Sequence, residues 1–504
     1  MSQLSTHGQF IRAVIGLIAF SIFLRWGSFF ISVINHDEST YIVIADELLR
    51  GKVYLKDVFD TKPVGLYWLF QGLVWLSGDS IILLRLFAAV FIGLTAGVWW
   101  WTARRVTKST AVAWATGITY IFLCSTWTYF GISPNTEIYF NLFTAVAIAL
   151  MVSRVWRSNH NQTQSDWLTF SCVGVVLGLA AIIKPVVAAE SLAMGLFLLW
   201  RGWKTQQLRQ AIFARCLPMT IAFCLPLLMV YSYYSSKGLL DALYFYNYEL
   251  TKRYPVDKTI LERVIYVGEY LRFFPVLIVA MWPYSSMTPD DISKPIKTYR
   301  QFLFLLGACV LIFILLPGKS FGHYFIQLHP VAAALFGLWF LPGRNEWPKL
   351  RAFFTRYGKL LLIATSIGLS LAYFFKYQTK YDQPKAIAEW LNDRLEEGDQ
   401  VFMENYHQIV YHLIDRPVPT PYVHSSLLFY DHHVEALELD LETEAQRLIE
   451  NSNLVYVVRR KRQPELYDNA LTQAIDTHFK VVKDFDEELI ILKRVQPIGQ
   501  GLAE

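Results

Sequence analysis

Long apolar runs recur along this chain, and they constrain its fold more than any other feature. A helix needs about 20 consecutive apolar residues to cross the hydrocarbon core of a bilayer. The sequence is therefore predicted to form a polytopic α-helical membrane protein with about eleven transmembrane helices. The predicted spans are 10–34, 80–102, 110–130, 138–155, 166–183, 185–201, 214–234, 264–282, 301–316, 324–341 and 359–376.

Composition supports the same fold class. The chain has 504 residues, of which 54% are hydrophobic and 17% are charged, whereas a soluble protein carries about a quarter charged residues. The first run is longer than the core of a signal peptide, and Asn35-His36-Asp37 is not a small-residue cleavage site, so we interpret it as a retained helix. Segment 63–77 is apolar but short, which predicts an interfacial helix lying along the membrane.

Basic residues predict the orientation, because Lys and Arg are enriched in cytoplasmic loops. They gather in alternate loops, which places the N-terminus in the cytoplasm. An odd number of spans then places the C-terminus outside. The basic residues of these loops are Arg104, Arg105, Lys108, Arg154, Arg157, Arg201, Lys204, Arg209, Lys294, Lys297, Arg300, Arg344, Lys349, Arg351, Arg356 and Lys359.

The composition changes after about residue 376. QPKAIAEWLNDRLEEGDQVFMEN predicts an amphipathic helix, a glycine stop and a strand, and AQRLIENSNLVYVVRR repeats this order. HFKVVKDFDEELIILKR predicts two paired strands. We therefore predict a transmembrane catalytic domain over 1–376, with a first outer loop at 35–79, and a small extracytoplasmic α/β domain over 377–504.

Two adjacent carboxylates, Asp37 and Glu38, follow the first span in HDESTYIVIADELL. A short helix is predicted over 39–50, ended by Gly51. One interpretation is that Asp37 caps this helix by accepting its free backbone N–H groups. The other is that Asp37 is a general base held at the membrane surface. Neighbouring helix positions point about 100° apart, so Glu38 is expected to have a different, supporting role.

Two cations come next along the chain. Lys62, in FDTKPVGLYW, lies on the outer side, where it either extends to lipid headgroups or binds a phosphate. Pro63 is predicted to begin the interfacial helix. Arg85 lies one turn into the second span, a depth at which ionisable residues face a cavity or a protein interior. Its alternative is a structural ion pair, for which Asp79 is the candidate partner.

Further polar residues mark the outer ends of later spans. Glu137, in SPNTEIYF, is either a second functional carboxylate or part of a helix start. Lys184-Pro185 is interpreted as a turn between two helices. Lys319, His323 and Tyr324, in PGKSFGHYF, combine a cation, an imidazole and a phenol, which together suit a phosphate.

Several motifs of soluble nucleotide and metalloprotease chemistry are absent from the sequence, including a P-loop, GxGxxG and HExxH. No nucleic-acid partner is predicted. Asp37, Glu38 and Glu137 are of the type that holds a divalent cation, but nothing in the sequence requires a metal.

The segments HDESTY, FDTKPVGLYW, GDSIILLRL, SPNTEIYFNLF and GHYFIQLHP, in this order, resemble the GT-C membrane glycosyltransferases. The resemblance is greatest to bacterial relatives of protein O-mannosyltransferases and lipid A aminoarabinose transferases. It implies a polyprenyl-phosphate-linked sugar donor and a bacterial inner membrane, with the C-terminal domain in the periplasm. It also implies that Asp37 deprotonates the acceptor and that Lys62 binds the donor phosphate. Thr40, Thr61 and Val64 depart from the aminoarabinose branch, which weakens the case for a lipid A acceptor.

The implied reaction is chemically simple. Because the departing lipid phosphate is a good leaving group, the site needs one base and several cations, rather than the paired carboxylates of glycosidases. Asp37 supplies the base, and Lys62, Arg85, Lys319 and His323, with Tyr324, supply the phosphate site. We expect inversion, with hexose or pentose transfer to an envelope glycan, lipid or protein among the membrane lipids. A transporter or flippase of lipid-linked sugars is less favoured, because the charges lie at the outer boundary rather than at the midplane. A ligase or polymerase with a diphosphate donor stays open.

Overall fold

The computed structural model describes residues 2–126, 131–156, 163–253, 258–274, 293–319, 321–342, 348–461 and 469–495. The chain divides into two compact units. Unit 1 comprises Met1–Phe30, Ile82–Tyr233 and Val256–Thr379. Unit 2 comprises Ile31–Ile81, Tyr234–Pro255 and Lys380–Glu504.

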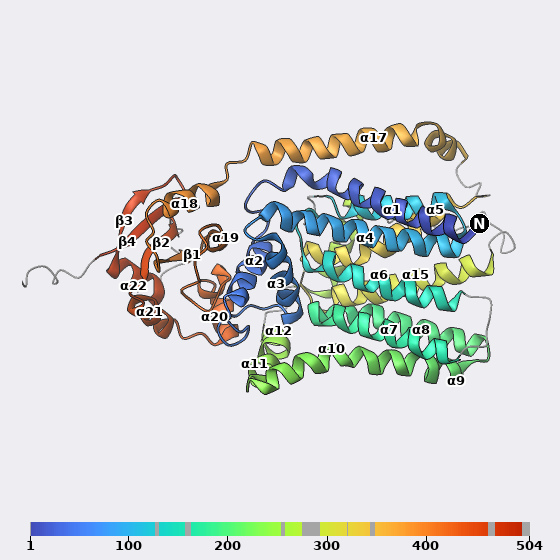
Figure 1. The fold of residues 1–504 in the computed structure, drawn as a ribbon, viewed down its shortest axis with the longest axis horizontal. Helices are drawn as coiled ribbons and strands as arrows, with labels where there is room; N and C mark the ends of the chain where they lie inside the picture. Colours follow the sequence, from blue (N-terminus) through green and yellow to red (C-terminus); the bar gives the residue numbers. More distant parts are fainter. Residues whose placement is uncertain are drawn as a thin grey trace, which may run out of the picture. The chain divides into compact units, whose positions relative to one another are not determined.

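Unit 1 is entirely helical in its described part, and its long helices run along a common direction (Figure 1). Eight helices of the described chain are long and apolar enough to cross a membrane, which confirms the predicted polytopic α-helical class. Their order follows the predicted runs. The α-helices of unit 1, long and short, are α1 (Ser2–Arg25), α4 (Ile81–Thr107), α5 (Thr110–Leu123), α6 (Thr136–Val155), α7 (Thr163–Ile183), α8 (Ala188–Lys204), α9 (Leu208–Gln210), α10 (Leu217–Ser236), α13 (Ile260–Phe273), α15 (Lys294–Leu315), α16 (His329–Gly337) and α17 (Pro348–Gln378).

Three of the eleven predicted spans differ from these eight helices. The run 110–130 contains α5, which has only 14 residues. The run 264–282 begins within α13, and its part after residue 274 lies outside the described residues. The run 324–341 is divided into the 3-10 helix η6 (Gly322–Leu328), α16 and the 3-10 helix η7 (Leu338–Phe340). Pro330 explains this division, because it has no N–H to continue a helix from η6 but fits the first turn of α16.

Glycines allow close helix packing in unit 1. A Cβ atom on Gly93 of α4 would lie 2.5 Å from the Ile18 Cα of α1. A Cβ atom on Gly337 of α16 would lie 2.1 Å from the Thr116 Oγ1 of α5. Small residues at such crossings let helix backbones approach each other within a membrane. These two positions therefore fix the packing of α1 on α4 and of α5 on α16.

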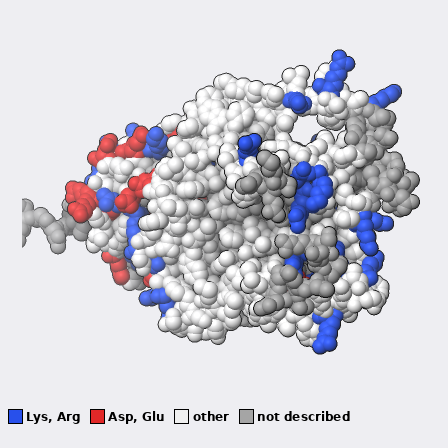
Figure 2. Space-filling view, turned by 45° about the vertical axis from the view of Figure 1, so that its right-hand side comes forward, with Lys and Arg blue, Asp and Glu red and all other residues white. Residues whose placement is uncertain are grey.

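One end of unit 1 is strongly basic. Figure 2 shows Lys and Arg side chains gathered there, with few acidic side chains on the visible surface. Arg104 and Arg105 end α4, Arg154 lies in the last turn of α6, and Lys204 ends α8. The cytoplasmic orientation of this end stays a prediction. Arg157 and Arg344, also assigned to the basic loops, lie outside the described residues.

Unit 2 combines short helices with a four-stranded sheet of order β1-β2-β4-β3. β1 and β2 are parallel, whereas β4 is antiparallel to both β2 and β3. β3 is an edge strand with a bulge between Val481 and Lys483. The α-helices and strands of unit 2 are α2 (His36–Leu49), α3 (Val64–Ser77), α11 (Leu240–Tyr244), α12 (Leu250–Arg253), α18 (Gln383–Asn392), β1 (Gln400–Glu404), α19 (Ile409–Leu413), α20 (Asp431–Leu437), α21 (Leu441–Glu450), β2 (Leu454–Arg460), α22 (Ala470–His478), β3 (Phe479–Asp484) and β4 (Leu489–Arg494).

The C-terminal part of unit 2 confirms the predicted helix and strand pattern. Gly398, with φ +90°, separates α18 from β1, and α21 is followed by β2. The sequence predicted to form paired strands contains β3 and β4. Helices α21 and α22 pack together, and the hydrophobic core includes Phe402, Leu448, Val457, Ile475 and Leu492.

Helix α2 begins at His36 rather than at the predicted residue 39 and ends before Gly51, which has φ +92°. It packs against both α3 and α19 within unit 2. Tyr41 illustrates the contact with α3, since its ring centroid lies 5.1 Å from that of Phe70. The predicted second helix of the loop is α3, with Pro63 at its N-cap. Contacts on two sides hold the first turn of α2 in a defined position.

Candidate functional site

Asp37 lies in the first turn of α2, but it does not cap the helix. Asn35 is the N-cap residue, and its side-chain oxygen accepts the Asp37 backbone N–H at 3.2 Å. The capping interpretation of Asp37 therefore loses its structural basis. A carboxylate in this turn is also favoured by the positive end of the helix dipole.

Asp37 and Lys62 lie together in unit 2. The Lys62 Nζ is 3.7 Å from an Asp37 carboxylate oxygen. The Asp37 side chain is 21% exposed and that of Lys62 is 24% exposed. This is a long, partly solvated ion pair, in which both groups can be reached by a substrate.

The loop that carries Lys62 is rigidly held. The Tyr54 hydroxyl donates to the Lys62 carbonyl at 2.6 Å and to the Asp60 carbonyl at 2.8 Å. The Tyr67 hydroxyl of α3 donates to the Asp60 carboxylate. Burial raises the pKa of Tyr54 and of Tyr67 well above the ordinary value, so both phenols remain protonated donors. The backbone that carries the Lys62 side chain is consequently positioned by buried aromatic residues.

Glu38 faces a different environment from its neighbour. Glu38 is only 3% exposed, whereas the Asp37 side chain is 21% exposed. This contrast follows from the 100° turn between adjacent helix positions. The supporting role predicted for Glu38 stays a prediction.

Residues 407–412 hold α2 from the opposite end of the sequence. The Gln408 Nε2 donates to the His36 carbonyl at 3.0 Å and to the Thr40 hydroxyl at 2.6 Å. The His36 and His407 rings stack with centroids 4.4 Å apart. Further along α2, the His412 Nδ1 lies 2.8 Å from an Asp46 carboxylate oxygen. Gln408 thus fixes the turn from which Asp37 projects.

The stacked histidines are neutral at pH 7. Burial, with the neighbouring His424 and Arg460, lowers the pKa of His36 to about 4. Burial, with His36 and Arg460, lowers the pKa of His407 to about 3. Two stacked imidazolium rings would repel each other, whereas two neutral rings pack as aromatic residues.

A second cluster lies in unit 1 around Glu137. Glu137 is 1% exposed and forms a close ion pair with Lys184. The Thr136 hydroxyl donates to the other carboxylate oxygen at 3.0 Å. The Lys184 Nζ also lies 4.3 Å from the centroid of the Tyr324 ring. Asn135 is the N-cap of α6 but makes no side-chain capping bond, and the functional role predicted for Glu137 stays a prediction.

His323 and Tyr324 belong to the same cluster through η6. Their ring centroids lie 4.9 Å apart at an interplanar angle of 88°. The η6 segment is fixed by the Asn141 Nδ2, which donates to the Ile326 carbonyl at 3.0 Å. Gln327 fixes it further by donating to Glu190 of α8 at 2.9 Å. The structure therefore brings Glu137, His323 and Tyr324 together.

Arg85 and Lys319 occupy other positions in unit 1. Arg85 is 2% exposed. Its guanidinium donates to the Ser28 carbonyl at 2.9 Å. This bond joins α4 to the short 3-10 helix that follows α1. Lys319 follows Gly318, whose φ of +72° forms the turn between α15 and η6. The phosphate-binding roles of Arg85 and Lys319 stay predictions.

Two residues of these clusters were missed by the site prediction. Lys184 was interpreted as part of a turn, although a single cation within the apolar sequence AAIIKPVV is itself a signal for a buried partner. Gln408 carries no such signal, because its partners precede it by about 370 residues. Among the residues that the structure describes, no three His, Cys, Asp or Glu side chains are grouped to hold a metal ion.

Comparisons with known proteins agree with this architecture. Residues 36–234 match the family model of dolichyl-phosphate-mannose-protein mannosyltransferase. ArnT from Cupriavidus metallidurans bound to undecaprenyl phosphate is 15% identical, with a TM-score of 0.64 over 98% of this chain and 99% of that chain. The Archaeoglobus fulgidus oligosaccharyltransferase tethered with an acceptor peptide is 13% identical, with a TM-score of 0.50 over 94% and 72%. No curated protein sequence matches the chain.

These similarities show the fold. The chain has the GT-C fold, and it is an integral membrane protein with a small C-terminal sheet domain. The match to the mannosyltransferase model begins at His36. It therefore begins in the same turn of α2 that carries Asp37.

Proposed function

We propose that the chain is a glycosyltransferase that moves a sugar from a polyprenyl-phosphate-linked donor to a cell-envelope acceptor. The observation that carries the proposal is the Asp37–Lys62 pair, in which a carboxylate not needed for capping lies 3.7 Å from an ammonium group. The family match supports a lipid-phosphate sugar as donor. The undecaprenyl phosphate bound by ArnT supports a polyprenyl carrier.

In the proposed reaction, Asp37 is the general base. The acceptor hydroxyl transfers its proton to the Asp37 carboxylate while its oxygen forms a bond to the anomeric carbon of the sugar. The bond between that carbon and the phosphate oxygen breaks, and the phosphate leaves with the bonding electrons. One displacement at the anomeric carbon inverts its configuration.

Lys62 is proposed to stabilise the departing phosphate. Its ammonium group is a point charge suited to a phosphate, and the hydrogen bonds from Tyr54 fix the backbone that carries it. In unit 1 we propose His323, Tyr324 and Lys319 as further phosphate-binding residues, with Arg85 as a supporting cation. Lys184 is proposed to support this set, because it pairs with Glu137 and lies over the Tyr324 ring.

The acceptor side of the reaction is proposed to lie outside the cytoplasm, in the periplasm of a bacterial cell. The basic end of unit 1 supports a cytoplasmic position for that end (Figure 2). The acceptor is a glycan, a lipid or a protein of the envelope. Thr40 is one of the residues that depart from the aminoarabinose branch. Its hydroxyl accepts a hydrogen bond from Gln408 at 2.6 Å.

The test is sugar transfer by the purified chain in liposomes, with a radiolabelled polyprenyl-phosphate sugar and an envelope extract as acceptor. Asp37→Asn is expected to lower the transfer rate by about 10²–10⁴-fold and to leave the melting temperature unchanged. Asp393→Asn, at an exposed carboxylate of unit 2, is the matched control and should retain full activity.

Two outcomes would overturn the proposal. One is full transfer by Asp37→Asn. The other is movement of the labelled lipid across the bilayer without any transfer, as expected of a flippase. The configuration of the new glycosidic bond, measured by NMR coupling constants, tests inversion separately.

A further inference from the structure

A polar cavity of about 500 Å³ lies within unit 2, and its lining includes neither Asp37 nor Lys62. Its walls come from the segment after α2, the loop before residue 422 and helix α21. The volume falls in the range of small-molecule sites. The lining residues are Lys52, Lys56, Asp57, Phe59, Val418, Pro419, Thr420, Pro421, Tyr422, Glu444 and Arg447.

The cavity lining includes three cations, Lys52, Lys56 and Arg447, and two carboxylates, Asp57 and Glu444, which is an excess of one positive charge. The two carboxylates are already bonded within the wall, because Asp57 accepts the Val53 backbone N–H at 2.7 Å and Glu444 lies 3.1 Å from Arg447. Lys52 pairs with Glu47. Lys56 is exposed and forms no ion pair with any residue of the described ranges.

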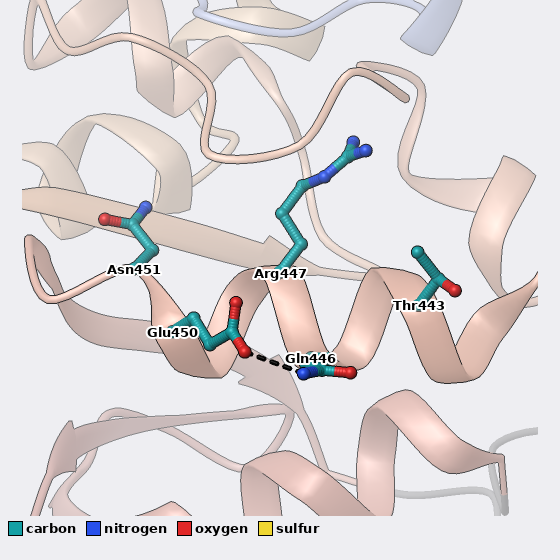
Figure 3. Close-up of a pocket in the computed structure, with 5 residues that line it drawn as sticks. All are labelled: Thr443, Gln446, Arg447, Glu450 and Asn451. Atoms are coloured by element: carbon teal, nitrogen blue, oxygen red, sulfur yellow. Dashed lines mark hydrogen bonds between the residues drawn. The ribbon is translucent and has the colours of Figure 1, made fainter.

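Arg447 extends the cationic surface. Its side chain is 48% exposed, and its Nη1 group donates to Glu444 at 3.3 Å. A second hollow of about 420 Å³ is also lined by Arg447, together with Thr443, Gln446 and Glu450 of α21 and Asn451, which follows this helix (Figure 3). In that hollow Gln446 donates to Glu450 at 2.7 Å. Both hollows are lined by Arg447.

The remaining wall is rigid and partly aromatic. The Phe59 N–H donates to the Pro421 carbonyl at 2.8 Å. The rings of Phe59 and Tyr422 stack with centroids 5.5 Å apart, and Phe59 stacks on Tyr246 at 5.3 Å. Prolines at 419 and 421 restrict the loop further. A preorganised wall of this kind binds a ligand with little loss of conformational entropy.

We propose that this cavity binds an anionic saccharide, namely a sugar that carries a carboxylate or a phosphate group. Lys56 and Arg447 bind the anion. The hydroxyl of Thr420 and the carboxylates of Asp57 and Glu444 bind sugar hydroxyls, which need acceptors as well as donors. The inference rests on the proposed function, which it deepens by naming the acceptor class.

The lining favours a saccharide over an acidic peptide. A peptide binds through a free strand edge or through apolar pockets for its side chains. Here the backbone N–H of Phe59 is already bonded to Pro421, and most of the lining side chains are polar or charged. Mixed donors and acceptors on one wall are suited to a polyhydroxylated ring.

The test is calorimetric titration of the purified full-length chain in detergent. The probes are glucuronate, glucose 6-phosphate, neutral glucose, inorganic phosphate and hexaglutamate. At least one of the two anionic sugars is expected to bind at least tenfold more tightly than glucose or inorganic phosphate. Comparison of glucuronate with glucose 6-phosphate identifies the preferred anion.

Variants locate the binding. Lys56→Gln and Arg447→Gln should each weaken binding of the preferred anionic sugar about tenfold. Lys385→Gln, at an exposed lysine of α18 outside the cavity, should not change it. Asp37→Asn should bind as tightly as the natural chain, so loss of transfer and loss of this site are separate results. Unchanged affinity in both cavity variants would overturn the inference, as would tighter binding of inorganic phosphate or hexaglutamate than of either anionic sugar.

Discussion

Two carboxylate–lysine pairs in this chain have the same chemistry but different environments. Asp37 and Lys62 are 21% and 24% exposed and lie 3.7 Å apart. Glu137 and Lys184 are 1% and 12% exposed and are in close hydrogen-bonded contact. The Asp37–Lys62 pair, called the open pair below, leaves both charged groups partly exposed to a substrate. The Glu137–Lys184 pair, called the closed pair below, has a carboxylate that is bonded to both Lys184 and Thr136. This arrangement favours a structural and electrostatic role.

The comparison shows that residue type alone does not identify a base. Both pairs consist of an acidic residue near a helix start and a distant lysine. A base must be reachable by the proton it removes, whereas a buried ion pair must remain bonded to offset its lost hydration. Exposure and separation therefore distinguish the two pairs where sequence does not.

The largest effect on stability is expected when one charged group of the closed pair is removed and its partner is kept. Glu137→Gln leaves the Lys184 ammonium buried without its carboxylate, which should lower the free energy of unfolding by about 3–5 kcal/mol. The double variant Glu137→Gln, Lys184→Met removes both charges and should recover much of this loss. Thermal melting of the purified variants in detergent measures both. Normal melting of the single variant would show that the pair is not structurally important.

The open pair should respond through activity rather than stability. Lys62→Met removes a charge-assisted contact to the donor phosphate and should lower kcat/KM for the lipid-linked sugar by about 10–100-fold. Its melting temperature should stay within about 2 °C of that of the natural chain, because exposed ion pairs contribute little. Steady-state transfer assays at varied donor concentration provide the measurement. A large drop in melting temperature with normal kcat/KM would reverse the assignment of the two pairs.

Substitution of Gln408 tests whether the open pair depends on the hydrogen bonds that hold the first turn of α2. Gln408→Leu keeps the side-chain volume but removes the hydrogen bonds to His36 and Thr40. We expect about a tenfold loss of kcat, because a displaced base loses its alignment with the acceptor. The KM for the donor should change little, which a purely structural defect would not produce. Gln408→Glu, which retains an acceptor but loses the donating amide, should not restore kcat.

The smallest expected effect concerns pH. His36 and His407 have lowered pKa values of about 4 and about 3, so the unfolded chain binds protons below about pH 6.5 that the folded chain does not. Stability should therefore fall as the pH drops from about 6.5 to 4. His412 acts in the opposite sense, since Asp46 raises its pKa against the effect of burial. Melting temperatures of the natural chain and of His407→Phe, which keeps a ring but does not titrate, should diverge in this range.

Local sequence patterns predicted much of the fold. Apolar runs identified the eight long helices, and glycine stops with alternating residues identified β1 and the β3–β4 hairpin. The run 324–341 differed because Pro330 prevents one continuous helix, although most residues of that run are apolar. Such interruptions depend on a single missing N–H rather than on hydropathy.

The candidate site was only partly predictable. Asp37 and Asn35 are both good capping residues, and only the structure shows that Asn35 takes this position. Lys184 and Glu137 are 47 residues apart, and Gln408 is more than 360 residues from Thr40. These contacts arise from the tertiary fold, so no local pattern contains them.

The bulged edge strand β3 has a consequence for how this protein behaves at high concentration. Its outer side carries exposed Val481 and Val482 between Lys480 and Lys483. A flat apolar edge would offer unpaired backbone groups to a strand of another molecule. Here the bulge bends the strand and the flanking lysines repel an identical edge. The sheet is thereby protected from strand-to-strand aggregation when many copies crowd one membrane surface.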